Sequence, residues 1–180
     1  MGIEIEKKYR VTRARRDQLK DRLRESDATF EGEEFEENTL YAGGSLDLSK
    51  QVLRLRRVDG KAVLTYKERH VSDSTIKRHR EDETGVEDAE AFTAILDALG
   101  YTPTLVYEKR RATWRWQGAE IVVDELPFGL FVEIEGEENV ITEVEQLLGL
   151  AEAEAEMATY PALARQSGQK RGDVIEARFK

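Results

Sequence analysis

Ile3-Glu4-Ile5-Glu6-Lys7-Lys8 is the stretch that decides the fold, because its charged and aliphatic residues alternate. Successive side chains of a β-strand point to opposite faces, so Glu4, Glu6 and Lys8 share one face and the isoleucines share the other. A single charged face is usually solvated, as most charged residues are. Taken alone, the stretch would therefore predict an ordinary edge strand.

The same pattern recurs in two later stretches of the chain. Leu53-Arg54-Leu55-Arg56 carries two arginines at alternate positions, and Val132-Glu133-Ile134-Glu135 carries two glutamates. Like charges next to one another weaken a sheet unless charges of opposite sign lie among them. We therefore expect the glutamates and arginines of the three strands to share one space.

Composition limits the classes of protein and partner. The 180 residues fit a single domain, residues 1–180, with 39% hydrophobic and 36% charged residues. No apolar run approaches the roughly 20 residues that span a bilayer, and no signal peptide is recognisable, so we expect a cytoplasmic protein with no membrane partner. The absence of cysteine excludes disulfides and thiolate chemistry. A net charge of −9 disfavours duplex nucleic acid, whereas local basic clusters suit a small polyanion.

Periodicity and turn residues predict about eight strands and four helices, mostly in hairpin order. We expect strands at 3–8, 38–41, 51–58, 61–68, 76–84, 104–116, 119–124 and 130–135, and helices at 13–25, 88–99, 138–148 and 162–166. Residues 31–37 form an acidic segment outside these strands, 71–75 a polar loop, and the tail from Ser167 a loose end. Hairpin order favours an antiparallel sheet with helices packed on it, so the predicted fold class is α+β.

The apolar faces of the strands and helices must cover one another. The helix at 88–99 has an apolar stripe that we expect to be core, formed by Phe92, Ile95, Leu96 and Leu99. The helical stripes need the aliphatic strand faces as partners. The charged strand faces are then left facing one another, which predicts a closed or nearly closed barrel of eight antiparallel strands with a charged lumen and helices outside.

A lumen lined by glutamates, arginines and lysines is costly unless the charges compensate or a ligand completes the set. Carboxylates are the oxygen ligands that Mg²⁺ and Mn²⁺ prefer, and Mg²⁺ usually takes one or two of them plus substrate phosphates. Arginine holds phosphate oxygens in pairs through its planar guanidinium. These residue types together indicate a site for a metal-bound polyphosphate. The alternative is a network of ion pairs that binds no ligand.

Glu4-Ile5-Glu6-Lys7-Lys8 resembles the ExExK signature of the CYTH family, also called triphosphate tunnel metalloenzymes. The resemblance covers nearly the whole chain in the expected order, through Asn38-Thr39-Leu40-Tyr41, Leu53-Arg54-Leu55-Arg56, Leu64-Thr65-Tyr66-Lys67, Glu81 with Glu83, Lys109 with Arg111, Asp124, Phe131-Val132-Glu133-Ile134-Glu135 and Thr159-Tyr160. ExExK alone is short and weak, but the ordered set is specific. The family includes class IV adenylate cyclases, thiamine triphosphatases and inorganic triphosphatases, and the resemblance implies a tunnel of eight antiparallel strands.

The resemblance also implies roles for the charged residues. The metal ligands would be Glu4, Glu6, Glu133 and Glu135, supported by Asp124 and Glu81. The phosphates would be held by Lys8, Arg54, Arg56, Lys67 and Arg111, with Lys109 joining them or lying at the mouth. Glu4, Glu6, Lys8 and Lys67 would serve catalysis directly. Mg²⁺ or Mn²⁺ would be the cofactor, with one cation neutralising the triphosphate and a second positioning the attacking water.

One strand departs from the family's pattern. The family often has an arginine two residues before its middle glutamate, Glu81, where this chain has His79 between Arg78 and Arg80. The register of this strand is therefore open. His79 and His70 lack a paired acidic residue at catalytic spacing, so both are expected on the surface.

Three aromatic residues and two basic residues complete the predictions. The strand predicted at 104–116 carries three aromatic residues that we expect to pack under a helix rather than stack on a substrate ring, namely Tyr107, Trp114 and Trp116. A last basic contact near the C-terminus has only Lys170 and Arg171 as candidates.

The first functional prediction is a metal-dependent hydrolase of inorganic triphosphate, a nucleoside triphosphate or thiamine triphosphate. The second is a class IV adenylate cyclase, in which the ribose 3′-oxygen attacks the α-phosphorus. The third is a non-catalytic module that binds a polyphosphate or a nucleotide. No adenine pocket can be recognised from the sequence, and the protein is expected to be a monomer or a homodimer.

Overall fold

The structure is a computed structural model that describes residues 2–69 and 75–180. Within these ranges the chain forms ten strands and four helices. In chain order they are β1 (Gly2–Val11), α1 (Arg13–Glu25), β2 (Thr29–Gly43), β3 (Gln51–Val58), β4 (Lys61–Arg69), β5 (Lys77–Val86), α2 (Ala89–Ala98), β6 (Tyr101–Trp116), β7 (Ala119–Leu126), β8 (Gly129–Glu135), α3 (Glu138–Leu148), α4 (Tyr160–Ser167), β9 (Gln169–Arg171) and β10 (Val174–Ala177). His70 and most of the loop predicted at 71–75 lie outside the described residues.

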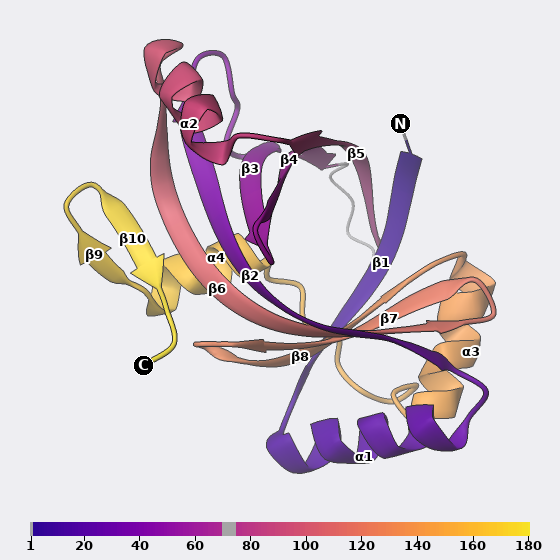
Figure 1. The fold of residues 1–180 in the computed structure, drawn as a ribbon. Helices are drawn as coiled ribbons and strands as arrows, with labels where there is room; N and C mark the ends of the chain where they lie inside the picture. The colour runs from indigo at the N-terminus through magenta and orange to yellow at the C-terminus, as the bar shows by residue number, and fades with distance from the viewer. Residues whose placement is uncertain (1, 70–74) are drawn as a thin grey trace.

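Strands β1 to β8 close into an antiparallel barrel (Figure 1). Their order around the barrel is β2-β3-β4-β5-β1-β8-β7-β6, and β6 pairs back onto β2 from Thr29 opposite Arg115 to Gly43 opposite Tyr101. Closure gives each of the eight strands a neighbour on both sides. The predicted α+β fold with a closed eight-stranded barrel is confirmed.

Two tight hairpins fix the register of the barrel strands. Asp59 and Gly60 join β3 to β4 with backbone φ angles of 47° and 77°, and Gln117 and Gly118 join β6 to β7 with 46° and 86°. Positive φ at both central residues is what a type I′ hairpin turn requires, and the Asp-Gly pair was the sequence signal for the first of them. Each turn therefore fixes which residues of the two strands that it joins lie opposite one another.

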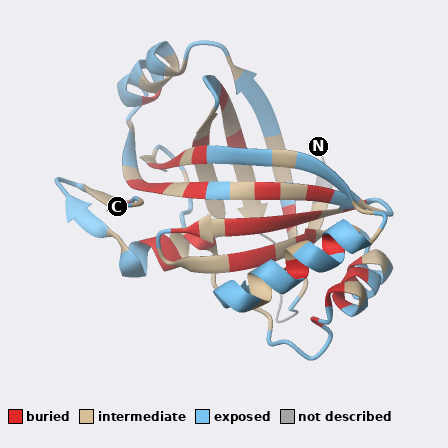
Figure 2. Cartoon of the chain, turned by 60° about the horizontal axis from the view of Figure 1, so that its bottom comes forward, coloured by how far each residue is buried: buried red, intermediate tan, exposed pale blue. Residues whose placement is uncertain are grey.

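The main core lies outside the barrel, between its wall and helices α1 and α3. These two helices lie side by side against β1, β7 and β8, and their inner faces are the buried parts of otherwise exposed helices (Figure 2). The fully buried residues of this core include Leu19, Leu23, Ile121, Val132, Ile134, Ile141, Val144 and Leu148. The aliphatic faces of the charged strands therefore pack under helices, as the alternation predicted. The described helices are all too short or too polar to cross a bilayer.

Helix α4 packs on one end of the lumen. The inward-facing positions of the surrounding strands are apolar there, and Leu105 and Phe131 contact Tyr160 and Leu163 of the helix in a second buried cluster. Further along the same strand faces the side chains become charged, as at Lys109. The helix thus covers an apolar end, beyond which the lumen is polar.

The acidic segment at 31–37 is a strand, so its placement outside the sheet was wrong. It forms the first half of β2 and pairs with the basic half of β6, where Glu34 lies opposite Arg111 and Glu36 opposite Lys109. Opposite charges on neighbouring strands stabilise the pair. The acidic run therefore finds its partner in a part of the chain about 75 residues away, as the register shows.

The C-terminal tail is ordered, which corrects the prediction of a loose end after Ser167. Strands β9 and β10 form a hairpin, and β10 runs parallel to β6 with Ile175 opposite Leu105. Ala177 is buried, and Arg178 Nη1 lies 2.7 Å from Glu37 Oε2 and 2.9 Å from Glu108 Oε1. Backbone pairing and these ion pairs anchor the tail to the barrel wall.

Helix α2 forms as predicted, but its stripe is only partly core. Leu96 is buried among Tyr41, Leu55 and Ala62, whereas Ile95 and Leu99 are 55% and 65% exposed. The helix sits at the rim of the barrel (Figure 1), so only one narrow side of it meets the strands. The prediction that the whole stripe is core was therefore wrong for these two residues.

Candidate functional site

The lumen holds a cavity of about 130 Å³ that gathers the charged residues of six strands. Its charged lining residues are Glu4, Glu6, Lys8, Arg54, Arg56, Lys67, Glu81, Lys109, Arg111, Glu133 and Glu135. These are all the residues predicted for the site except Asp124. Residues taken from stretches more than 100 positions apart thus meet in one space.

Cross-strand register explains why the acidic residues gather. Glu6 on β1 lies directly opposite Glu135 on β8, and the next inward pair sets Lys8 opposite Glu133. Side chains in opposite positions stand about 5 Å apart at Cβ, and like charges there are destabilising. Burial would raise the pKa of Glu6, but His79 and Lys67 hold it well below its ordinary value, so Glu6 stays ionised. The cost of the facing pair therefore falls on Glu135, whose pKa is raised.

Lysine 67 partly compensates the acidic wall. Its Nζ lies 2.7 Å from Glu4 Oε2 and 2.5 Å from Glu81 Oε2. Burial would lower the pKa of Lys67, but Glu6, Glu81 and Glu4 outweigh it and raise that pKa above its ordinary value. The amine is therefore firmly cationic and holds two carboxylates in place.

Carboxylates next to this cluster remain under-compensated. Burial, followed by the charges of Glu4 and Glu120, raises the pKa of Glu135 to about 7. Burial, followed by the charge of Glu6, also raises the pKa of Glu133. An excess of negative charge thus stands at the junction of β1 and β8, where a bound cation would relieve it.

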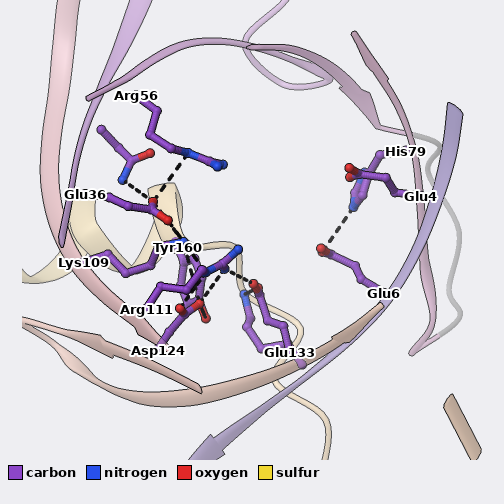
Figure 3. A network of polar contacts seen from close by, with 12 residues as sticks. Glu4, Glu6, Glu36, Arg56, His79, Lys109, Arg111, Asp124, Glu133 and Tyr160 are labelled. Carbon is purple, nitrogen blue, oxygen red and sulfur yellow. Dashed lines mark hydrogen bonds and ion pairs between the residues drawn. The ribbon is translucent and has the colours of Figure 1, made fainter. Parts of the chain in front are cut away.

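The basic side of the lumen is built around Arg111 (Figure 3). Its Nε and Nη2 lie 2.8 and 2.7 Å from the two carboxylate oxygens of Asp124, and Nη2 also lies 2.9 Å from Glu133 Oε2. Asp124 is fully buried and also accepts a hydrogen bond of 2.8 Å from the Tyr160 hydroxyl. Burial would raise the pKa of Asp124, but Arg111 and Lys109 hold it below its ordinary value. Asp124 does not line the cavity, and through these two contacts it orients the Arg111 guanidinium that does. The role of Asp124 as a metal ligand stays a prediction.

A buried glutamate that the sequence reasoning missed supports the other basic residues. Glu36 Oε2 lies 3.1 Å from Lys109 Nζ, 3.5 Å from Arg56 Nε and 3.1 Å from Asn38 Nδ2 (Figure 3). Burial works against ionisation, yet Lys109, Arg111 and Arg56 hold the pKa of Glu36 well below its usual range. Glu36 precedes Asn38 by two residues on the same strand face, so extending the predicted strand backward would have found it.

Burial lowers the pKa of Lys109, a buried lysine of the lumen. Only 2% of the residue is exposed, and burial together with the nearby Arg111 lowers the pKa of its amine to about 8. Its position inside the lumen decides between the two places that the sequence left open. Lys109 joins the basic side and does not lie at the mouth.

The structure fixes the register of β5 and corrects the placement of one histidine. His79 is 4% exposed and faces the lumen, with Nε2 3.3 Å from Glu6 Oε1. Arg80 and Arg78, one position to either side, are outside, where Arg80 pairs with Asp82. The prediction that His79 is a surface residue was wrong, because alternate residues of β5 point inward together with Glu81.

Other residues of uncertain role also find their places. Tyr107 lines the lumen, whereas Trp114 is buried in the outer core with its ring centroid 4.9 Å from that of Phe30. Lys170 and Arg171 are exposed on β9 and do not line the cavity. Tyr107 is also buried in the cluster under α4, so the structure confirms packing for Tyr107 and Trp114. It does not bring the two C-terminal candidates to the site.

The donor set fits a divalent cation that is completed by its ligand. Among the described residues, no three aspartates, glutamates or histidines converge closely enough to hold a metal by themselves. Mg²⁺ characteristically takes only one or two carboxylates and completes its shell with phosphate oxygens and water. Glu133 and Glu135 of β8 supply hard oxygen donors of that kind, and burial beside other carboxylates raises the pKa of both.

Comparisons with known proteins agree with this geometry. The sequence matches the CYTH domain family over residues 2–164. The PH1012 protein from Pyrococcus horikoshii OT3 has a TM-score of 0.77 at 27% identity, covering 89% of this chain and 98% of that one. A conserved hypothetical protein from Pyrococcus furiosus has a TM-score of 0.75 at 25% identity, with 89% and 99% coverage.

More distant structures share the fold. HpAC1 from Hippeastrum, a proposed adenylyl cyclase that has a dominant triphosphatase activity, is 21% identical with a TM-score of 0.72, covering 92% of this chain and 96% of that one. The search of curated proteins found no significant match.

Proposed function

Because this chain belongs to the CYTH domain family, we propose that it is a divalent-metal-dependent enzyme that hydrolyses a triphosphate. The observation that carries the proposal is the lumen itself, in which a basic side built on β3 and β6 faces carboxylates of β1 and β8 across one cavity. A triphosphate with a bound cation has the matching charge distribution. A pure ion-pair network would leave no reason for Glu135 to lie beside Glu4 and Glu120, where burial and their charges raise its pKa.

The basic residues supply the phosphate contacts. Arg111 contacts Asp124 and Glu133 through Nε and Nη2, which leaves its Nη1 for a phosphate oxygen. Arg54 lines the same cavity, and its Nη2 lies 3.1 Å from Thr65 Oγ1, which keeps the guanidinium in place. Lys8 is 2% exposed and completes the cationic set beside Glu133. Orienting contacts of this kind fix the charged groups before the substrate arrives.

The carboxylates of β1 and β8 would hold the cation. Glu4 and Glu6 on one strand and Glu133 and Glu135 on the next line the same cavity. A divalent cation bound there supplies Lewis-acid activation of the phosphoryl group and of the attacking water. Lys67 keeps Glu4 and Glu81 in position through its two short ion pairs.

The size of the cavity favours a phosphate chain over a whole nucleotide. Sites for drug-sized ligands commonly enclose about 300–1,000 Å³, whereas this cavity encloses about 130 Å³. A base or ribose would therefore lie outside it, and cyclase chemistry needs the ribose 3′-oxygen at the reacting phosphorus. We therefore place hydrolysis of inorganic triphosphate first. The dominant triphosphatase activity of HpAC1, a protein of the same fold, agrees with this order.

The test is a product assay on the purified protein with tripolyphosphate, ATP and thiamine triphosphate in turn, each with Mg²⁺, Mn²⁺ or EDTA. We expect phosphate and pyrophosphate from tripolyphosphate with either metal and none with EDTA. Cyclic AMP with pyrophosphate from ATP would instead establish a cyclase, and binding without turnover would establish a non-catalytic module.

A paired variant connects activity to the proposed metal ligands. Glu4→Gln with Glu6→Gln should lower activity about 10³-fold, because Lewis-acid stabilisation of the transition state is worth several kcal/mol. Its fold should persist, since Gln keeps the shape of the side chain and Lys67 keeps its short ion pair with Glu81. Glu143→Gln, at an exposed position on α3, is the matched control and should leave the rate unchanged. A double variant that retains its rate would remove these glutamates from the mechanism.

A further inference from the structure

Histidine 79 stands among the candidate metal ligands and has no assigned role. It lies directly opposite Glu4 in the β1–β5 register, and its Nε2 lies 3.3 Å from Glu6 Oε1 (Figure 3). Two carboxylates therefore flank one imidazole on the acidic side of the lumen. The side chain is enclosed, since only 4% of the residue is exposed.

The hydrogen bonding of this imidazole is poor for a buried group. Nδ1 has no hydrogen-bond partner among the described residues, and the contact from Nε2 to Glu6 is longer than the 2.7–3.2 Å of an ordinary hydrogen bond. Buried polar atoms are nearly always paired, so an exception calls for an explanation. A cation bound at Nε2 would replace the long contact to Glu6, whereas Nδ1 needs a partner of its own.

The spacing of the two side chains suits a shared cation. Two ligand atoms at about 2.1 Å from an octahedral metal, at right angles to one another, lie about 3.0 Å apart. The observed 3.3 Å between His79 Nε2 and Glu6 Oε1 differs from this by only a few tenths of an ångström. A small side-chain rotation is enough to reach it, and Glu4 stands on the other side of the ring in the strand register.

We propose that His79 Nε2 and a carboxylate oxygen of Glu6 bind one divalent cation together, and that this nitrogen donor makes the site prefer Mn²⁺ or Co²⁺ over Mg²⁺. The inference rests on the proposed function for the identity of the site. Mg²⁺ favours oxygen ligands almost exclusively, whereas imidazole strengthens binding of first-row transition metals. Phosphate oxygens and water complete the coordination shell.

Two other roles for His79 make different predictions. As a hydrogen-bond partner of Glu6 alone, it would orient that carboxylate without touching the metal. As a donor to a phosphate oxygen, it would affect triphosphate affinity and leave the affinity for Mn²⁺ alone unchanged. A spectroscopic measurement on bound Mn²⁺ distinguishes metal ligation from both of these roles, because only a ligand nitrogen is bound directly to the metal.

The experiment uses the full chain loaded with Mn²⁺ and a methylene analogue of tripolyphosphate, which resists hydrolysis and contains no nitrogen. Pulsed electron paramagnetic resonance detects a nitrogen nucleus bound to Mn²⁺ through its modulation of the echo. We expect ¹⁴N modulation in the wild type, its replacement by the ¹⁵N pattern after labelling with ¹⁵N-histidine, and its loss in His79→Gln. His70→Gln, which changes the chain's other histidine, is the control and should keep the modulation.

Metal affinity gives the second readout. Titration of Mn²⁺ by its free-ion signal should show binding about tenfold or more weaker in His79→Gln, while Mg²⁺ affinity, measured by competition, changes less than about threefold. Isotope labelling of the wild type keeps the test valid if the variant folds badly. Absence of histidine nitrogen coupling in the wild type, or its loss in His70→Gln alone, would overturn the proposal.

Failure of this inference and failure of the proposed function give different results. Release of phosphate from tripolyphosphate without nitrogen coupling would leave the triphosphatase in place and remove His79 from the metal. Nitrogen coupling without any phosphate release would establish the histidine ligand and contradict the hydrolase.

Discussion

Replacing Glu135 by glutamine should make the metal-free protein more stable while reducing its activity. Burial, with Glu4 and Glu120, raises the pKa of Glu135 to about 7 from its ordinary 4.5. The titratable groups that surround it are Glu4 and Glu6 on β1, Glu120 on β7 and Lys67 on β4. Because the folded state binds this proton more tightly than the unfolded chain, ionisation of Glu135 opposes folding at neutral pH.

The magnitude follows from the size of the pKa change. A rise from 4.5 to about 7 corresponds to about 3 kcal/mol at neutral pH, at 1.36 kcal/mol per pKa unit. Glu135 is partly exposed, so solvent screening reduces this to about 1–2 kcal/mol. The gain should be full above about pH 7 and fall to about a quarter near pH 5, where the wild-type carboxyl is protonated in the fold.

The assay is thermal and urea unfolding in EDTA at pH 7.5 and pH 5, with wild type and Glu135→Gln side by side. A gain of this size raises the melting temperature by about 2–8 °C in a protein of this length. Glu143→Gln, at an exposed position of α3, controls for the loss of a surface charge. A destabilised Glu135→Gln, or an equal gain at both pH values, would refute the reasoning about repulsion at the β1–β8 junction.

Three further substitutions test the supporting contacts. Tyr160→Phe removes the 2.8 Å hydrogen bond to Asp124 and keeps the ring, so the free energy of unfolding should fall by about 2 kcal/mol in urea titration; an unchanged value would show that this bond is not formed. Lys109→Met leaves the buried carboxylates of Glu36 and Asp124 without a partner amine and should cost about 3 kcal/mol or more in the same titration; a neutral effect would contradict their charged state. Arg178→Ala breaks exposed ion pairs of the C-terminal hairpin and should change stability by less than about 1 kcal/mol with an unchanged rate of phosphate release, so a loss of activity would place the hairpin in the site.

Alternation of charge along the strands predicted most of the site. The period of two is a geometric property of a strand, so Glu4, Glu6 and Lys8 had to share a face whatever the fold. The remaining step was that the apolar faces of the helices pack against the aliphatic strand faces. The charged strand faces then point into the barrel. Asp124 shows the limit of this argument. Alternation tells which face of the strand a side chain lies on, but not whether it reaches the cavity or is covered by neighbouring side chains.

The other errors come from partners that no local pattern reveals. Residues 31–37 are a strand only because the basic half of β6 lies beside them, far along the chain. The short strand β10 likewise exists through its pairing with β6. Ile95 and Leu99 lie on a helical stripe that periodicity assigns correctly, but the rim position of α2 offers them no surface to cover. The register of β5, and hence the burial of His79, depended on its neighbour β1.

The most direct test of the account is to locate a bound cation and triphosphate in a crystal. Crystals grown with Mn²⁺ and the methylene analogue of tripolyphosphate, measured for the anomalous signal of manganese, would place both. The account predicts a manganese peak in the lumen beside Glu4 and Glu6, with the phosphate chain extending toward Arg54 and Arg111. Manganese and the analogue bound only on the outer surface, with the lumen closed by its own ion pairs, would contradict it.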